Sequence, residues 1–199
     1  MSARADIIGD VRRALAGAPP APVIERNYLA PSTASTGEVI ERFIERVADY
    51  QAVVERCDAN EVAKRIARAI PQEGAVVVPA GLSWQVPGAV EDTGLSAREL
   101  DAVHAVVTAA TAGIAETGTI LLQHGEAEGR RALSLVPDLH VCVIREDQIF
   151  AGVPEVMSQL DPRRPTTWIS GPSATSDIEL IRVEGVHGPR TLHVIVVGT

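Results

Sequence analysis

The apolar positions in the first third of the chain repeat at the three-to-four-residue spacing of amphipathic helices. Residues 36–56 carry the most regular pattern, and residues 60–70 form another such segment that ends before Pro71. Residues 2–16 form the earliest, with apolar side chains at Ile7, Ile8, Val11 and Leu15. We therefore predict three helices in this part of the chain.

A proline-rich segment, residues 18–22, separates the first predicted helix from the rest of the chain. Its prolines fix φ and cannot continue a helix, so they favour an extended backbone. We therefore expect an N-terminal helical arm with its linker over residues 1–35, and a domain over residues 36–199. The pattern leaves open whether the arm docks on its own domain or on a partner.

From residue 75 onward the pattern changes to short, β-branched apolar runs bounded by glycine and proline. Such runs are typical of strands that are buried on both faces. The candidates are residues 75–78, 103–108, 118–122, 141–144, 166–170 and 192–197, and residues 152–160 are a candidate helix. Helices that alternate with buried strands predict an α/β fold with a mainly parallel sheet.

The excess of acidic over basic residues argues against one class of partner. The 199 residues include 18 basic and 26 acidic side chains, which gives a formal charge of −8. This excess argues against a nucleic-acid partner, because few basic groups are available to contact phosphates. No apolar run is long enough to span a membrane and no apolar leader is present. We therefore expect a cytoplasmic protein without a membrane span.

The cysteine content argues against a metal or cluster site in this chain. The two cysteines, Cys57 and Cys142, are far apart in the sequence and form no CxxC pair. Iron–sulfur and zinc sites normally need several closely spaced ligands. We therefore predict no metal site and no cofactor bound by this chain alone.

The first candidate site is the segment Gly113-Ile114-Ala115-Glu116-Thr117-Gly118-Thr119. Glu116 is a candidate catalytic carboxylate. Gly118 permits a close backbone approach to a ligand, and the hydroxyls of Thr117 and Thr119 can bond its anionic group. The alternative is a turn in which Glu116 accepts hydrogen bonds from nearby N–H groups.

The second candidate site is the loop Ser170–Glu179, which follows a predicted strand. In an open α/β sheet such a loop lies at the carboxyl edge, where ligands bind. We expect Gly171, Pro172 and Ser173 to contact a carboxylate, with Asp177 as a catalytic residue nearby. An ordinary loop with a serine cap is the alternative.

Three cationic or titratable side chains add to these candidates. His187 lies between two glycines, where an imidazole can act as a general acid or base, and an ordinary turn is the alternative. His140 directly precedes a predicted strand and is a candidate ligand contact or a buried core residue. Arg131, next to Arg130, can hold an anionic substrate or remain a solvated surface charge.

Three motifs taken together resemble the LUD (lactate utilization) domain family. They are residues 113–119, the segment Ser134-Leu135-Val136-Pro137-Asp138-Leu139-His140-Val141, and the stretch from Ser170 to Pro189 that contains Gly185-Val186-His187-Gly188. The N-terminal helix and the proline-rich linker are similar to those of the short C-type members. The resemblance spans about residues 36–199.

The resemblance implies a three-layer α/β/α fold of the NagB/RpiA/CoA transferase type. It also implies a component that supports the oxidation of L-lactate to pyruvate, with the iron–sulfur clusters in partner proteins A and B. A small carboxylate would then be the ligand of the candidate residues.

Two other functions stay open from the sequence. One is a stand-alone enzyme acting on a small anionic or CoA-thioester substrate, with Glu116 as nucleophile or acid–base group. The other is a scaffold subunit without catalytic activity, which binds its partner through the acidic surface and the arm. The sequence alone does not decide between these functions and the lactate-utilization component.

Overall fold

A six-stranded parallel sheet forms the centre of the fold. The computed structural model describes residues 3–19, 22–25, 32–175, 183–184 and 188–198. In the central sheet the strand order is β1-β12-β7-β4-β2-β3, and every neighbouring pair is parallel. The strands are β1 (Val53–Cys57), β2 (Val76–Val78), β3 (Val90–Glu91), β4 (Ala105–Ala109), β7 (Leu139–Arg145) and β12 (Thr191–Val197). The predicted α/β fold with a mainly parallel sheet is therefore confirmed.

A smaller mixed sheet lies beside the central one, in the order β8-β5-β6-β9. Its strands are β5 (Ala112–Ile114), β6 (Thr119–Leu122), β8 (Ile149–Phe150) and β9 (Thr167–Ile169), and a separate antiparallel pair is formed by β10 (Ala174–Thr175) and β11 (Val183–Glu184). β5 and β6 form an antiparallel hairpin, and β9 adds to it through the pairing of Trp168 with Leu121.

The position of β9 corrects one expectation. We predicted that the loop after residue 170 lies at the carboxyl edge of the parallel sheet, and this is wrong because β9 belongs to the smaller sheet. Its side chains alternate between the two faces of that sheet, and Trp168 is left exposed.

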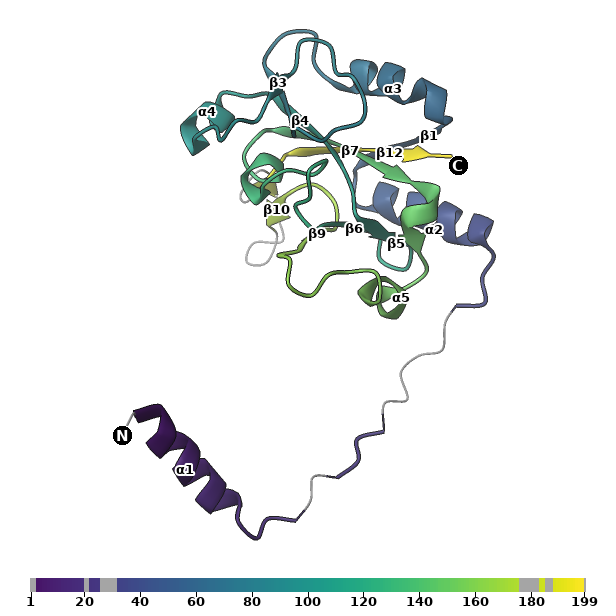
Figure 1. Ribbon diagram of the computed structural model, residues 1–199. Coiled ribbons are helices and arrows are strands. Elements are labelled where there is room, and N and C mark those ends of the chain that lie inside the picture. The colour runs from purple at the N-terminus through teal and green to yellow at the C-terminus, as the bar shows by residue number, and fades with distance from the viewer. Residues whose placement is uncertain (1–2, 20–21, 26–31, 176–182, 185–187, 199) are drawn as a thin grey trace.

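Helices and the smaller sheet cover the two faces of the central sheet, as Figure 1 shows. On one face, Ile66 of α3 (Val62–Ala69) packs against β-branched residues of β4, β7 and β12. On the other face, Phe43 of α2 (Thr36–Asp49) is fully buried in a cluster that includes residues of β6, β7 and β12. The remaining described α-helices are α1 (Ala3–Leu15), α4 (Ala97–Asp101) and α5 (Val153–Met157).

The helix that we predicted over residues 36–56 is shorter in the structure. α2 begins after a capping box between Ser35 and Glu38, and it ends at Asp49. Gln51 then adopts a positive φ of 65°, which interrupts the helix. Val54 pairs with Val194 in the central sheet, so the apolar residues near 54 belong to strand β1 and not to a continuation of the helix.

The N-terminal helix α1 stands away from the body of the molecule (Figure 1). It forms where predicted, but none of its residues is buried. Within the described part of the chain, no helix combines the length and the apolar character needed to cross a bilayer.

Candidate functional site

The turn between β5 and β6 positions the first group of predicted site residues. Gly118 has a positive φ of 62°, and a Cβ atom there would lie 2.7 Å from the backbone carbonyl carbon of Arg46. The turn therefore packs directly on the backbone of α2, and only glycine allows this approach. Glu116 and Thr117 are exposed on the outer side of the turn, whereas Thr119 is buried.

Three hydroxyl groups connect this turn to β9. The hydroxyl oxygens of Thr117 and Thr119 are 2.7 Å apart, and that of Thr119 lies 2.8 Å from Ser170 Oγ. Each hydroxyl can donate one hydrogen bond and accept others, so the three form a continuous chain. The structure thus brings Thr119 of the first predicted site against the start of the second.

Ser170 lines a pocket of about 280 Å³ that we call the serine pocket. It lies between the loop after β9 and the first residues of β7 and β12, where Leu192 is in register with His140. Its lining includes Ser134, His140, Trp168, Gly171, Pro172 and Ser173. Four of the predicted ligand-binding residues, His140 and the three of residues 171–173, therefore share one pocket.

His140 is the titratable side chain of the serine pocket. Its ring is almost completely buried, and Nε2 lies 2.8 Å from Thr108 Oγ1 of the neighbouring strand β4. Burial lowers the pKa of His140 to about 4, because water can no longer solvate the imidazolium ion. The imidazole is therefore neutral at physiological pH and acts by hydrogen bonding, not by charge.

The loop that follows β9 is held by close packing. Gly171 has a φ of 84°, and a Cβ atom there would lie 2.5 Å from Cβ of Tyr50. The backbone N–H of Ser173 donates a hydrogen bond of 2.9 Å to the carbonyl oxygen of Pro189. This loop is therefore fixed both against the residue that follows α2 and against the segment that leads into β12.

Glu116 opens onto a different pocket from the serine pocket. We call it the α5 groove; its volume is about 600 Å³, and it is lined by Ser32, Arg42, Glu116, Phe150, Pro154 and Glu155 among others. The backbone N–H of Glu116 donates to the carbonyl oxygen of Ala151, at 3.1 Å, which holds the residue beside β8. The structure therefore separates Glu116 from His140 and residues 171–173.

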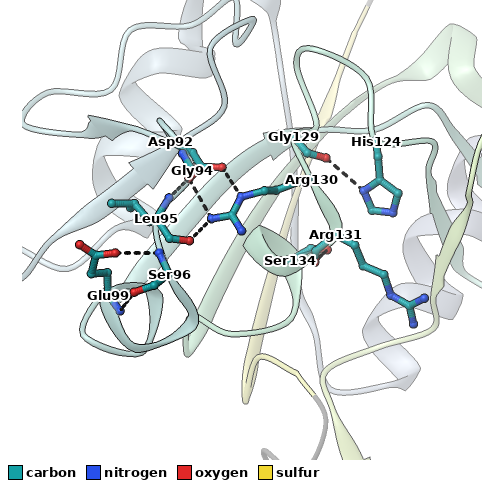
Figure 2. Close-up of polar contacts among 10 residues, drawn as sticks. All are labelled: Asp92, Gly94, Leu95, Ser96, Glu99, His124, Gly129, Arg130, Arg131 and Ser134. Atoms are coloured by element: carbon teal, nitrogen blue, oxygen red, sulfur yellow. Dashed lines mark hydrogen bonds and ion pairs between the residues drawn. The ribbon is translucent and has the colours of Figure 1, made fainter.

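The two adjacent arginines have different surroundings, as Figure 2 shows. The guanidinium of Arg130 donates to both carboxylate oxygens of Asp92, at 2.7 and 3.0 Å, and to the carbonyl oxygen of Leu95. Arg131 is exposed and has no ion pair among the described residues. Arg131 is therefore the member of the pair whose charge is available to an anion.

The remaining predicted site residues, Asp177 and His187, lie outside the described residues. We did not predict Trp168, which lines the serine pocket, or Thr108, which supports its histidine; Ser170 begins the second predicted site but was not named as a ligand contact. An available signal was Trp168, one of two tryptophans in the sequence, which stands near the hydroxyl residues Thr167 and Ser170.

The two cysteines lie in different parts of the core. Cys57 packs in the cluster on the α3 side of the central sheet, and Cys142 packs in the cluster on the α2 side. Burial raises the pKa of the Cys142 thiol to about 12, so it remains protonated. In the described part of the chain, no group of three or more histidine, cysteine or acidic side chains is arranged to hold a metal ion.

The parallel sheet, the packed hairpin and the serine pocket together define an α/β protein with a small pocket beside its sheet. The LUD domain family matches residues 82–197, and the chain belongs to this family.

Several known proteins are similar over part or all of the chain. "Lactate utilization protein C" of Deinococcus radiodurans is 45% identical over 205 residues, which cover 98% of this chain and 96% of that protein. The protein of the same name from Halalkalibacterium halodurans is 34% identical over 45% of this chain and 43% of its own length. The crystal structure of a DUF162 family protein from Deinococcus radiodurans covers 83% of this chain and 99% of that one, with 42% identity and a TM-score of 0.72.

Proposed function

We propose that this chain is the cytoplasmic C component of a lactate-utilization system. In this proposal it supports the oxidation of L-lactate to pyruvate together with two iron–sulfur proteins, the A and B components. The observation that carries the proposal is the 45% identity, over nearly the whole chain, to a lactate utilization protein C.

The reaction itself indicates which proteins would accept electrons and which would bind the substrate. Conversion of lactate to pyruvate removes two electrons and two protons from the substrate. The clusters of the partner proteins would accept the electrons, and this chain would bind the carboxylate substrate or product. The proposal therefore assigns no cofactor of its own to this chain.

The serine pocket is the best candidate for that carboxylate. No acidic side chain is among its described lining residues, whereas the α5 groove contains Glu116 and Glu155. In a chain with a net charge of −8, a lining free of carboxylates favours an anion. The hydroxyls of Ser134 and Ser170 and the neutral ring of His140 supply hydrogen-bonding groups of the kind that hold a small carboxylate.

We also assign a role to each of the remaining predicted site residues. Thr117, Gly118 and Thr119 support Ser170 from the β5–β6 turn. Asp177 and His187 stay candidates for acid–base chemistry, and Arg131 stays a candidate for attracting the anion. Glu116 has no contact with the ligand here, because it lines the α5 groove.

Two measurements test the pathway and the pocket separately. For the pathway, deletion of the gene should abolish growth on L-lactate and leave growth on another carbon source unchanged. Normal growth on lactate in a strain without a second copy of the gene would contradict the pathway assignment. In cells that carry the intact gene and grow on L-lactate, this chain should co-purify with iron-containing proteins.

For the pocket, calorimetric titration with L-lactate and with pyruvate should detect binding to the purified protein. Ser170→Ala should weaken that binding by about fivefold to tenfold, because it removes one hydrogen bond. Ser158→Ala, in the α5 groove, is the matched control and should leave it unchanged. Equal effects of the two substitutions would place the ligand elsewhere.

A further inference from the structure

The helix α1 presents an apolar stripe without a described neighbour. Ile7, Ile8, Val11 and Leu15 are between 39% and 63% exposed, although their spacing places them on one face of the helix. Arg4 precedes Ile8 by one helical turn, so its guanidinium lies at the end of the same face. A helix of this length is marginal in water unless its apolar face is covered.

The α5 groove is a surface of the body with matching chemistry. Phe150 and Pro154 contribute apolar surface to it, and the adjoining helix α5 exposes Val153 and Met157. Glu116 also lines the groove, and its carboxylate has no hydrogen bond or ion pair among the described residues. An apolar helix face with a cation at one end is complementary to such a surface.

The chain already contacts this groove just before α2. The backbone N–H of Ser32 donates a 2.9 Å hydrogen bond to Glu155 Oε1, and Ser32 itself lines the groove. This hydrogen bond is the leading cause of the lowered pKa of Glu155, so the carboxylate is held ionised. A helix bound in the groove would enlarge the contact surface that Ser32 already forms there.

The charges of the two surfaces are also complementary. α1 carries Arg4, Arg12 and Arg13 against Asp6 and Asp10, a net charge of +1. The lining of the groove carries Glu116 and Glu155 against Arg42, a net charge of −1. Opposite net charges favour the encounter of the two surfaces.

The position of α1 favours a groove on another molecule. α1 stands away from the body of its own chain (Figure 1), and none of its residues is buried there. Within its own chain the groove is contacted by Ser32 and not by α1, so the apolar stripe is open to a second molecule.

We propose that α1 docks in the α5 groove of a second copy of this chain, and that two copies exchange their arms reciprocally. The apolar stripe of each α1 covers Phe150, Pro154 and Met157 of the partner copy, and Arg4 pairs with Glu116. Such an exchange makes the same contact twice about a two-fold axis and closes as a dimer. This inference does not depend on the lactate-utilization proposal.

The first test measures the mass of the full chain in solution by light scattering after gel filtration, over a range of concentrations. We expect twice the 21.1 kDa of one chain. Val11→Asp should give a monomer that still unfolds in one cooperative transition, since α1 buries no residue in its own body. Gly9→Asp, which adds the same charge on the opposite face of α1, should remain a dimer.

A second test locates the contact by charge reversal. Arg4→Glu and Glu116→Arg should each weaken dimerisation by about fivefold, the size expected for a partly exposed ion pair. The double variant should return to within about twofold of the original dissociation constant. This restoration separates a direct pair from two unrelated defects.

Three outcomes would overturn the proposal. A monomer at every concentration would mean that the arm folds onto its own body or binds a different protein. A dimer that persists in Val11→Asp would show that another surface holds the two copies together. A dimer that is sensitive to Val11→Asp but insensitive to both charge reversals would place α1 outside the groove.

Discussion

Nε2 of His140 lies 2.8 Å from Oγ1 of Thr108, so a buried imidazole on β7 is held by a hydroxyl on the neighbouring strand β4. The hydrogen bond compensates one ring nitrogen, but it does not compensate the charge of a protonated ring. Burial therefore lowers the pKa of His140 to about 4, from an ordinary value of 6.5.

The first prediction concerns the stability of the protein in mild acid. Between pH 6.5 and pH 4 the unfolded chain binds a proton at residue 140 that the folded chain does not bind, so the free energy of unfolding falls as the pH falls. The total loss from this group is on the order of 3 kcal/mol. Urea denaturation at a series of pH values measures it.

The matched variant for this prediction is His140→Gln, which keeps a hydrogen-bonding side chain but cannot titrate. Its free energy of unfolding should depend less steeply on pH between 6.5 and 4 than that of the original protein. Identical slopes would show that His140 is protonated as readily in the folded state as in the unfolded chain.

The second prediction concerns Gly118, which the sequence analysis treated as a ligand contact. Gly118→Ala should lower the free energy of unfolding by about 1–3 kcal/mol, because the new Cβ atom would meet the backbone of Arg46 and Val47 at a positive φ. Gly37→Ala, within α2 and with open space around it, should be neutral or stabilising by up to about 1 kcal/mol. If both substitutions behave alike, the hairpin does not pack on α2 as described.

The third prediction separates Arg130 from Arg131. Hydrogen bonds from Arg130 are the first cause of the lowered pKa of Asp92, whose side chain is only 8% exposed. Arg130→Gln should therefore cost about 1 kcal/mol at neutral pH, a moderate value because Arg130 itself is partly exposed. Arg131→Gln should change the stability by less than about 0.5 kcal/mol.

The pH dependence of this pair provides the check. The lowered pKa of Asp92 contributes stability above the ordinary pKa of an aspartate, and this contribution is lost as the pH falls through the folded value. Thermal unfolding at pH 7 and at pH 3 should show the defect of Arg130→Gln shrinking in acid. A defect of the same size at both values would point to lost packing and not to the ion pair.

Much of the central sheet follows from local sequence pattern. The runs Val76–Val78 and Val194–Val197 are β-branched and apolar throughout, and they form largely buried parts of β2 and β12. By contrast, the apolar repeat of residues 36–56 spans two elements. The change from helix to strand at Gln51 is fixed by pairing with β12, which is distant in the sequence.

The sequence motifs predicted several residues of the candidate site, but they did not predict which surface each residue lines. His140 and residues 171–173 were proposed separately from their motifs, and the fold places them in one pocket. Glu116 and Thr119 stand close together in one motif but serve different surfaces. Thr119 begins β6 and points inward, whereas Glu116 lies in the turn and opens on the α5 groove. Local spacing does not reveal which side of a turn each residue faces.

The pairing of β1 with β12 constrains the order in which the protein can form during synthesis. β1 lies at an edge of the central sheet, and its described neighbour there is the strand that the ribosome makes last among the six. Until Thr191–Val197 has emerged, β1 and one side of β7 expose unpaired backbone and apolar side chains. Truncated chains that lack β12 are therefore expected to aggregate or to be degraded. The nascent chain is also expected to bind chaperones until β12 has formed.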